Sequence, residues 1–453
     1  MATTISAFTF LFAFFFIQAV HGAAIGVNYG RLANNLPPPP QVARFLAQTT
    51  TITGVKLFDA DPFVLQAFAG TNLSINLAIP NELIPKLTNL SFAQHWVHVT
   101  ILPHIQVTNI TRILVGNEIL STANKSLIRS LVPAMQNIHT ALTGVELHHR
   151  IKVSSTHSLS ILSTSTPPST GQFRKGYDTQ MIKPMLSFLR ATNSTFMVNA
   201  YPFFGCNADT LDYALFRGNT RVFDENTGLV YMNMLDGQLD AVYSAMKLLG
   251  FTDIEIVISE TGWPSVGDES EAGVDIESAR DYNAMLLQHV TSGVGTPLMP
   301  NRTFETYIFS LFNEDLKPGP RSERNFGLFH PDMTPVYDIG ILRSEGELPM
   351  PVRSTVPPEV PDQGQMKQWC IPKLNADIKA LQENIDFVCS QGLDCNPILP
   401  GGICFSPDIT RAHAAYAMNE YFQAFGRNSY NCDFGQTGEI TTTDPSYGSC
   451  KFN

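Results

Sequence analysis

Short apolar runs alternate with longer amphipathic stretches between Ala24 and about Arg343. Several runs, such as ITRILVG and IEIVIS, are apolar at successive positions, which is typical of parallel strands covered on both faces. Eight runs are rich in β-branched residues and predict eight strands. These runs are Ile25–Tyr29, Val55–Phe58, Leu73–Ile79, Ile110–Val115, Ile151–Ser154, Phe196–Tyr201, Ile254–Ser259 and Tyr307–Phe312.

The stretches between these runs carry apolar residues at helical spacing. The clearest of them are Lys125–Leu142, Asp178–Leu189, Met234–Leu249 and Ile276–Val290. Eight strand and helix units in about 320 residues match the size of a (β/α)8 TIM barrel, so the pattern predicts an α/β fold with this barrel at residues 24–343. Active-site residues of such a barrel follow the carboxyl ends of its strands. We therefore look for chemistry where each apolar run ends.

The alternation stops after Arg343. Residues 344–368 are rich in proline and predict a semi-rigid linker. Trp369 begins a second, mainly helical domain at 369–453, with amphipathic stretches at Ala376–Cys389 and Ile409–Phe425. Because a domain of this size has a small core, we expect disulfides to hold it together.

Six of the seven cysteines fall in this second domain, which predicts three disulfides. The count alone leaves all fifteen pairings open. The seventh, Cys206, has no apparent base nearby, and we expect a buried thiol rather than a nucleophile. The six are Cys370, Cys389, Cys395, Cys404, Cys432 and Cys450.

Residues 1–23 combine an apolar run with small residues before the expected cleavage point, as in a secretory signal peptide. The run is shorter than the ~20 apolar residues of a spanning helix, so we favour a signal over a membrane anchor and expect no membrane span. Secretion also gives meaning to six N-glycosylation sequons. These begin at Asn72, Asn89, Asn109, Asn124, Asn193 and Asn301.

The formal net charge of −11 disfavours a nucleic-acid partner, because binding to phosphate backbones needs clustered lysine and arginine. The sequence shows no phosphate-binding loop, dinucleotide motif or zinc signature. The histidines at 98, 104, 148 and 149 lack metal-ligand spacing. We therefore expect no cofactor and no metal, a neutral ligand, and a monomer.

Two glutamates follow predicted barrel strands. The fourth run ends in VGNEI, which places Glu118 after Asn117, and the seventh ends in VISETGWPS, which contains Glu260. Cleavage of a glycosidic bond needs one carboxylic acid to protonate the leaving oxygen and one carboxylate to stabilise or trap the sugar carbon. Either glutamate alone reads equally well as a strand-end charge with a basic partner, but the two together favour catalysis.

Other side chains at the same predicted end fit a sugar ligand. The segment FNEDLKPGPRSER after the eighth run contributes Lys317 and Glu323, which a solvated loop would also explain. The aromatic residues Tyr29, Tyr201 and Trp263 stand at strand ends, and sugar rings pack their C–H faces on such side chains. We expect these three and Asn117 to contact substrate.

Several motifs resemble plant β-1,3-glucanases of glycoside hydrolase family 17. They are IGVNYG, VKLFDAD, VGNEI, NAYPFF, YMNMLDGQLDAV, VISETGWPS, FNEDLKPG and FGLFHPD. The resemblance implies that Glu118 is the proton donor and Glu260 the nucleophile of a retaining mechanism, with Lys317 and Glu323 in support. Retention predicts the two carboxyl groups about 5 to 5.5 Å apart. The segments YPFFGC and MLDGQ depart from the family pattern.

The second domain resembles the X8 module, also called carbohydrate-binding module family 43, through WCIPK, LQENIDFVCSQGLDC, GGICF and CDFG. The resemblance implies the disulfides Cys370–Cys432, Cys389–Cys395 and Cys404–Cys450. Many relatives continue into a hydrophobic tail for a glycolipid anchor, whereas this sequence stops three residues after Cys450. We therefore expect an extracellular protein of the apoplast or cell wall without such an anchor.

The resemblance predicts an endo-hydrolase of β-1,3-glucan such as callose. One alternative is a non-catalytic β-glucan-binding wall protein, which the presence of both glutamates disfavours. Another is a mixed-linkage 1,3;1,4-β-glucanase, which the motifs leave open because the catalytic pair would be the same.

Overall fold

The computed structural model describes residues 24–218, 221–343, 367–373, 376–390, 393–424, 427, 429–435 and 437–452. The chain divides into two compact units, Met1–Thr355 and Val356–Asn453. The expected signal peptide at 1–23 and most of the expected linker lie outside the described residues. Each unit is considered by itself below.

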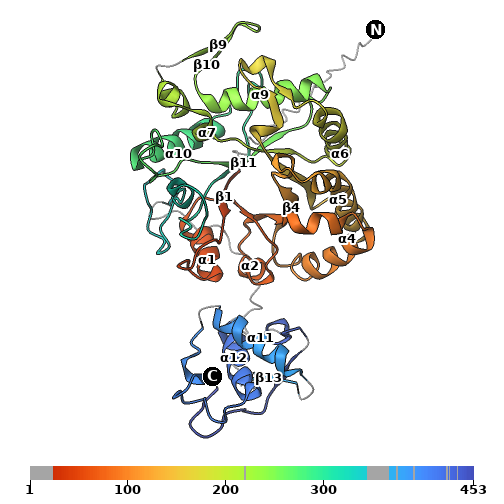
Figure 1. Cartoon of the computed structure of the whole chain (residues 1–453), viewed down its shortest axis with the longest axis vertical. Coiled ribbons are helices and arrows are strands. Elements are labelled where there is room, and N and C mark those ends of the chain that lie inside the picture. The colour runs from red at the N-terminus through yellow and green to blue at the C-terminus, as the bar shows by residue number, and fades with distance from the viewer. Residues whose placement is uncertain are drawn as a thin grey trace, which may run out of the picture. The chain divides into compact units, whose positions relative to one another are not determined.

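The first unit is a closed barrel of eight parallel strands in the order β1-β12-β11-β8-β5-β4-β3-β2. Figure 1 shows the strands at the centre and the helices around them. The predicted fold class is confirmed. The barrel strands are β1 (Ile25–Tyr29), β2 (Gly54–Leu57), β3 (Ser74–Ile79), β4 (Ile110–Asn117), β5 (Lys152–Ser158), β8 (Phe196–Asn199), β11 (Ile256–Thr261) and β12 (Thr306–Ile308).

Amphipathic helices cover the barrel, and asparagine or aspartate side chains cap several of them. Asn124 accepts hydrogen bonds from two backbone amides at the start of α5, and Asn233 and Asp275 cap α9 and α10. The helices are α1 (Pro39–Thr49), α2 (Pro62–Ala67), α3 (Ile84–Leu87), α4 (Leu90–Trp96), α5 (Lys125–Gly144), α6 (Lys183–Ala191), α7 (Pro202–Gly205), α8 (Leu211–Ala214), α9 (Met234–Leu248) and α10 (Ile276–Thr291).

The helix expected at Asp178–Leu189 begins instead with a π-helical turn, Asp178–Ile182, and continues as α6. Pro184 explains the change, because its ring nitrogen has no hydrogen to donate to the preceding turn. Two short antiparallel hairpins were not predicted. They are β6 (Leu162–Thr164) with β7 (Gln172–Phe173), and β9 (Val222–Asp224) with β10 (Leu229–Tyr231).

The barrel interior is filled by a buried layer that includes Leu114, Met197 and Tyr307. The Tyr307 ring lies where a Cβ on Gly26 would be only 2.4 Å away, so β1 needs a glycine at this point. Near the amino-terminal strand ends, both guanidinium NH groups of Arg112 donate to Glu305 at 2.9 and 3.0 Å. This packing fills the interior of the barrel near the amino-terminal ends of its strands.

Four of the six sequon asparagines come shortly before barrel strands. Asn72 precedes β3, Asn109 precedes β4, Asn193 precedes β8 and Asn301 precedes β12. All four therefore lie towards the amino-terminal end of the barrel. Asn109 is half-buried, whereas the other three are exposed.

The second unit contains α11 (Ile378–Ser390), α12 (Thr410–Ala424) and a two-stranded sheet of β13 (Trp369–Pro372) and β14 (Gly438–Thr441). Its core includes Trp369 and Phe422. Three disulfides cross it, and they are the three pairs that the family resemblance implies: Cys370–Cys432, Cys389–Cys395 and Cys404–Cys450.

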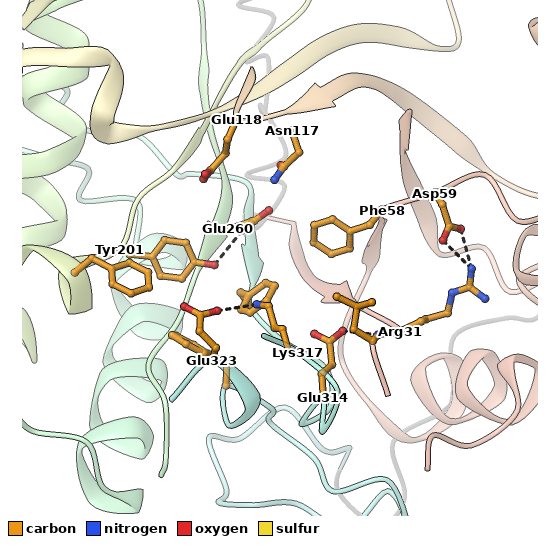
Figure 2. A pocket seen from close by; sticks show the side chains of 15 residues that line it. Arg31, Phe58, Asp59, Asn117, Glu118, Tyr201, Glu260, Glu314, Lys317 and Glu323 are labelled. Carbon is orange, nitrogen blue, oxygen red and sulfur yellow. Dashed lines mark hydrogen bonds and ion pairs between the residues drawn. The ribbon is translucent and has the colours of Figure 1, made fainter. Parts of the chain in front are cut away.

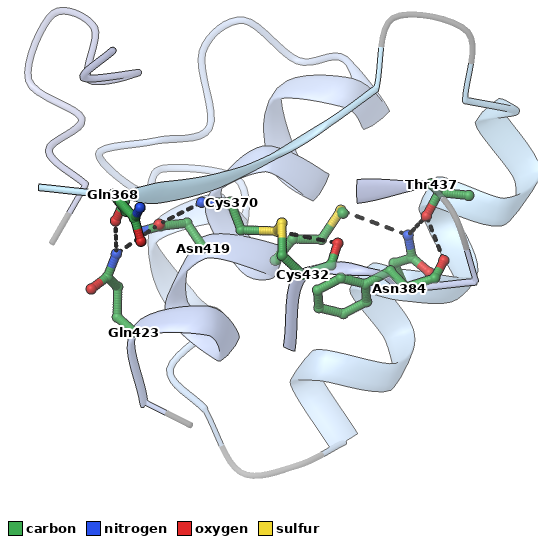
Figure 3. Close-up of a disulfide and its surroundings, with 9 residues drawn as sticks. Gln368, Cys370, Asn384, Asn419, Gln423, Cys432 and Thr437 are labelled. Carbon is green, nitrogen blue, oxygen red and sulfur yellow. Dashed lines mark hydrogen bonds between the residues drawn. A yellow bond between two sulfur atoms is a disulfide. The ribbon is translucent and has the colours of Figure 1, made fainter. Parts of the chain in front are cut away.

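Figure 3 shows the first of these disulfides beside α12, where the amide of Cys370 donates to the Asn419 side chain at 3.2 Å. This bond ties β13 to α12, and the disulfide ties the same strand to the segment around Cys432. Across both units, no helix in the described part of the chain has the length and apolar character needed to cross a membrane.

Candidate active site

Glu118 stands on a sharp turn at the end of β4. Gly116 and Glu118 both have left-handed backbone, with φ of 73° and 53°. Asn81 holds the turn from the side: its Oδ1 accepts from the Asn117 amide at 2.8 Å and its Nδ2 donates to the Asn117 carbonyl at 2.9 Å. The Glu118 amide donates to the Thr156 carbonyl at 2.9 Å. The turn therefore presents Glu118 in a fixed direction.

Glu260, on β11, has a partner for each carboxylate oxygen. Lys56 Nζ lies 2.5 Å from Oε1, and the Tyr201 hydroxyl donates to Oε2 at 3.0 Å. Lys56 is fully buried inside the barrel, and Glu260 is 7% exposed. Burial and the charge of Glu260 raise the pKa of Tyr201 well above its usual range, so this hydroxyl stays a donor. These contacts hold the Glu260 carboxyl group in a fixed position and direction.

Glu118 has a different environment. Its Oε1 accepts from Asn199 Nδ2 at 2.8 Å. Burial raises the pKa of Glu118, and the negative charge of Glu260 raises it further, while Asn199 and Lys56 oppose the change. Glu118 therefore holds a proton at a higher pH than an ordinary glutamate does. A protonated and an ionised carboxyl in one site can serve as acid and nucleophile.

Both glutamates line one cavity of about 720 Å³ at the carboxyl end of the barrel, which we call the catalytic cavity. Figure 2 shows their carboxyl groups facing the same space, with Asn117 beside Glu118 and Tyr201 reaching Glu260. The predicted convergence of the two strand-end glutamates is thus seen in the structure.

The segment after β12 forms another wall of the catalytic cavity. Lys317 Nζ lies 3.1 Å from Glu323 Oε2 and 4.1 Å from the centre of the Phe309 ring. Glu314 accepts from the Leu32 amide at 2.8 Å, and burial raises the pKa of Glu314. Lys317 and Glu323 lie on the rim as predicted, as a pair rather than as separate charges.

Two residues predicted to contact sugar do not line the catalytic cavity. Trp263 is fully buried, and its indole N–H donates to the Gly273 carbonyl at 2.8 Å. Tyr29 is also buried, with its ring against Phe68 and Phe312. On β1 the neighbouring Gly26 faces the barrel interior, so the alternation of side chains turns Tyr29 outward. The predicted contacts Asn117 and Tyr201 do line the catalytic cavity.

Sequence reasoning missed several polar residues of the site. Lys56 was hidden within the apolar run VKLF, although a lysine among buried strand residues was itself a signal. Asn199, which binds Glu118, closes the run that leads into Tyr201. Arg31 and Asp59 form an ion pair at 2.8 Å on the far side of the catalytic cavity.

The cysteine of the barrel and the described histidines point to no further chemistry. Cys206 is half-buried rather than fully buried; its thiol donates to the Phe203 carbonyl at 3.4 Å, and burial raises its pKa. Raising a thiol pKa lowers its reactivity. Within the described residues, no group of three or more histidine, cysteine or acidic side chains is arranged to hold a metal.

Comparison with known proteins accounts for this arrangement. The model of the glycosyl hydrolases family 17 matches residues 25–341, the whole barrel. The chain belongs to this family. The X8 domain model matches residues 368–439 in the second unit of this family 17 chain.

Similar proteins match the family 17 chain over most of its length. A glucan endo-1,3-beta-glucosidase of Triticum aestivum is 48% identical over 94% of each chain. A glucan endo-1,3-beta-D-glucosidase of Olea europaea is 43% identical over 100% of this chain and 99% of its own. Among solved structures, the pollen allergen CJP38 of Cryptomeria japonica, a beta-1,3-glucanase, is 41% identical with a TM-score of 0.67, covering 70% of this chain and 99% of its own.

Proposed function

We propose that the chain is a secreted, endo-acting and retaining hydrolase of β-1,3-glucan. Full-length similarity to proteins named glucan endo-1,3-beta-glucosidases supports this activity. The observation that carries the mechanism is the contrast within one cavity. Glu118 has a raised pKa, and both oxygens of Glu260 have a cationic or hydroxyl partner.

In the first step Glu118 donates its proton to the glycosidic oxygen while a Glu260 oxygen bonds to the anomeric carbon. The bond between that carbon and the leaving oxygen breaks, and the shortened glucan leaves. In the second step ionised Glu118 takes a proton from water, whose oxygen bonds to the anomeric carbon and releases Glu260. Asn117 and Tyr201 line the catalytic cavity together with the two glutamates, so we assign them contacts with hydroxyls of the reacting sugar.

The same contacts explain how Glu118 changes from acid to base. The negative charge of Glu260 raises the pKa of Glu118, and that charge disappears once Glu260 forms the sugar ester. The pKa of Glu118 therefore falls in the intermediate, while Lys56 nearby continues to favour the carboxylate form. Glu118 then accepts a proton from water more readily than it could before the ester formed.

A second cavity of about 600 Å³ meets the catalytic cavity at Glu118, Tyr201 and Phe204. Glu260 borders only the catalytic cavity, whereas Glu118 borders both. The glucosyl unit that bonds to Glu260 therefore occupies the catalytic cavity, and the half that receives the proton leaves through the second. Space on both sides of the scissile bond fits a cut within a chain, which favours endo action.

The deciding experiment compares the wild type with Glu260→Ala on laminarin and on mixed-linkage glucan. We expect the wild type to release reducing sugar from laminarin, with the new end first appearing as the β-anomer by NMR. The variant should lose at least a thousandfold in kcat and still bind laminarin. Glu269→Gln, on an exposed loop, is the matched control.

Retained turnover in Glu260→Ala would refute the assignment of the nucleophile. A wild type that binds but never cleaves laminarin would favour the non-catalytic wall protein. Faster cleavage of mixed-linkage glucan would favour the 1,3;1,4-specific enzyme. For the second unit we propose attachment to the same polymer, which a pull-down of residues 367–453 with insoluble β-1,3-glucan would test.

A further inference from the structure

The second cavity carries an unusual group of hydroxyls next to the catalytic acid. Ser121 Oγ lies 2.7 Å from both Ser158 Oγ and Ser160 Oγ, and these two lie 2.6 Å apart. Ser158 and Ser160 line the second cavity, and Ser121 follows Glu118 by one helical turn. We call these three residues the serine ring.

Hydrogen counting shows what the serine ring offers a ligand. Each hydroxyl has one hydrogen to donate and two lone pairs that accept. Three mutual contacts use all three hydrogens and one lone pair on each oxygen. In this arrangement each oxygen keeps an unused lone pair, so Ser158 and Ser160, which line the second cavity, can accept hydrogens from a ligand.

Two side-chain amides in the wall of the second cavity also have unused hydrogen-bond acceptors. Gln238 Nε2 donates to the Tyr201 carbonyl at 3.1 Å, and Asn199 Nδ2 donates to Glu118. Among the described residues, the buried carbonyl oxygens of both side chains have no hydrogen-bond partner. Both oxygens have almost no accessible surface, so a ligand donor reaches them only after the amide group rotates towards the cavity, and it would then remove a cost of about 1–3 kcal/mol.

The charges of the side chains that line the second cavity further limit the class of ligand that fits there. Glu118 is the one charged side chain among the described residues that line it, whereas Arg31, Asp59 and Lys317 line the catalytic cavity. Phe204, 62% exposed, stands where the two cavities meet. A neutral molecule with many hydroxyl donors and an apolar ring face fits this wall.

We propose that the serine ring and Gln238 are the specificity-determining residues for the leaving half of the substrate, a neutral glucan segment whose hydroxyls donate to them. The proposal rests on the proposed glucanase activity. Contacts to a remote part of a substrate are used to lower the barrier at the reacting bond. Losing them should therefore slow cleavage selectively when the leaving group is a sugar.

The test compares two substrates that differ in the leaving half. Cleavage of laminarihexaose releases a glucan segment as the leaving group. Cleavage of 4-nitrophenyl β-laminaritrioside releases 4-nitrophenol, which has no sugar hydroxyls. We expect Ser160→Ala and Gln238→Leu each to lower the ratio of kcat/KM for the hexaose to kcat/KM for the aryl glycoside by about twofold to tenfold, the worth of one hydrogen bond. Ser130→Ala is the control, because the Ser130 hydroxyl donates to the Ser126 carbonyl within α5 and Ser130 lines neither cavity.

An unchanged ratio in both variants, each with native circular dichroism and thermal unfolding, would overturn the proposal. If one variant fails to fold, the other still decides. A wild type that cleaves neither substrate would instead refute the proposed function, so the two failures are distinguishable.

Discussion

At the residue scale, the two glutamates show how surroundings separate chemically identical groups. Glu260 has a lysine and a tyrosine hydroxyl on its two oxygens. Glu118 has one amide donor and a nearby negative charge. Burial acts on both, but only Glu260 has a direct cationic partner. The difference in partners, more than the difference in burial, assigns the two roles.

The raised pKa of Glu118 predicts a pH-dependent gain in stability for Glu118→Gln. A carboxyl group whose pKa is raised on folding stabilises the protein fully below its unfolded pKa, and this contribution is lost as the pH rises through the folded pKa. The variant should therefore unfold at higher denaturant concentration than the wild type at neutral pH. The difference should shrink as the pH falls through the raised folded pKa, and it should be gone below the unfolded pKa of about 4.3.

Urea unfolding of the barrel at several pH values measures this difference, and it should amount to about 1.4 kcal/mol for each pH unit by which the pKa is raised. Glu269→Gln again serves as the control. A gain in the variant that is largest at acid pH would contradict the environment assigned to Glu118.

The residue pattern predicted the two glutamates because each closes an apolar run, a position that barrel geometry links to the active site. It did not indicate that Trp263 is buried, because the chain after β11 turns this side chain against Tyr282 of α10. It also missed Lys56, because a single lysine does not change the apolar character of VKLF. The direction of a side chain near a strand end depends on tertiary packing, which the sequence pattern alone does not predict.

At the element scale, the end of β4 is a tightly constrained turn beside the site. A Cβ on Gly116 would lie 2.2 Å from Ile119 Cδ1 and 2.9 Å from Asn81 Oδ1, the atom that holds the turn. Gly250, after α9, has a similar φ of 86° but nothing within 4 Å. Comparing alanine substitutions at the two glycines therefore separates the effect of backbone strain from the effect of a direct steric clash.

We expect Gly116→Ala to lower kcat severalfold or more, because the clash displaces the turn that carries Glu118. Gly250→Ala should lose only about 1–2 kcal/mol of stability, the cost of a Cβ in left-handed backbone, and keep its kcat. Thermal unfolding measures the loss of stability in both variants, and laminarin assays measure their kcat. Equal losses of stability with unchanged kcat in both would show that the turn tolerates the side chain.

The barrel strands and the long helices were predictable, and the two short hairpins were not. The expected helix at Lys125–Leu142 differs from α5 by two residues at one end, because its apolar spacing continues over five turns. The β6–β7 and β9–β10 hairpins have strands of two or three residues, too short to show a period. The β6–β7 region nevertheless borders the second cavity, so sequence patterns could not predict this part of the site.

At the scale of the whole molecule, the sequons are unevenly distributed over the barrel. If the chain is secreted as proposed, we expect glycans on Asn72, Asn193 and Asn301, which are exposed at the amino-terminal end. Asn109 should stay bare, because it is half-buried and shares a cavity of about 290 Å³ with Asn72. Peptide mass spectrometry after enzymatic removal of N-glycans, which converts each occupied asparagine to aspartate, measures occupancy.

Replacing those three asparagines by glutamine should leave kcat/KM for laminarin unchanged, since the catalytic cavity opens at the other end. Occupancy of Asn109 in place of Asn72, or a loss of activity in the triple variant, would contradict this arrangement.

The distribution of sulfur in the chain has a practical consequence. The barrel has one cysteine and can form no internal disulfide, whereas three disulfides hold a unit whose core is small. Losing a native disulfide typically costs a small domain about 2–5 kcal/mol. A mild thiol reductant should therefore unfold the carboxyl-terminal unit and leave the amino-terminal unit folded. The folded barrel can then be studied in the uncut polypeptide, without truncation or protease.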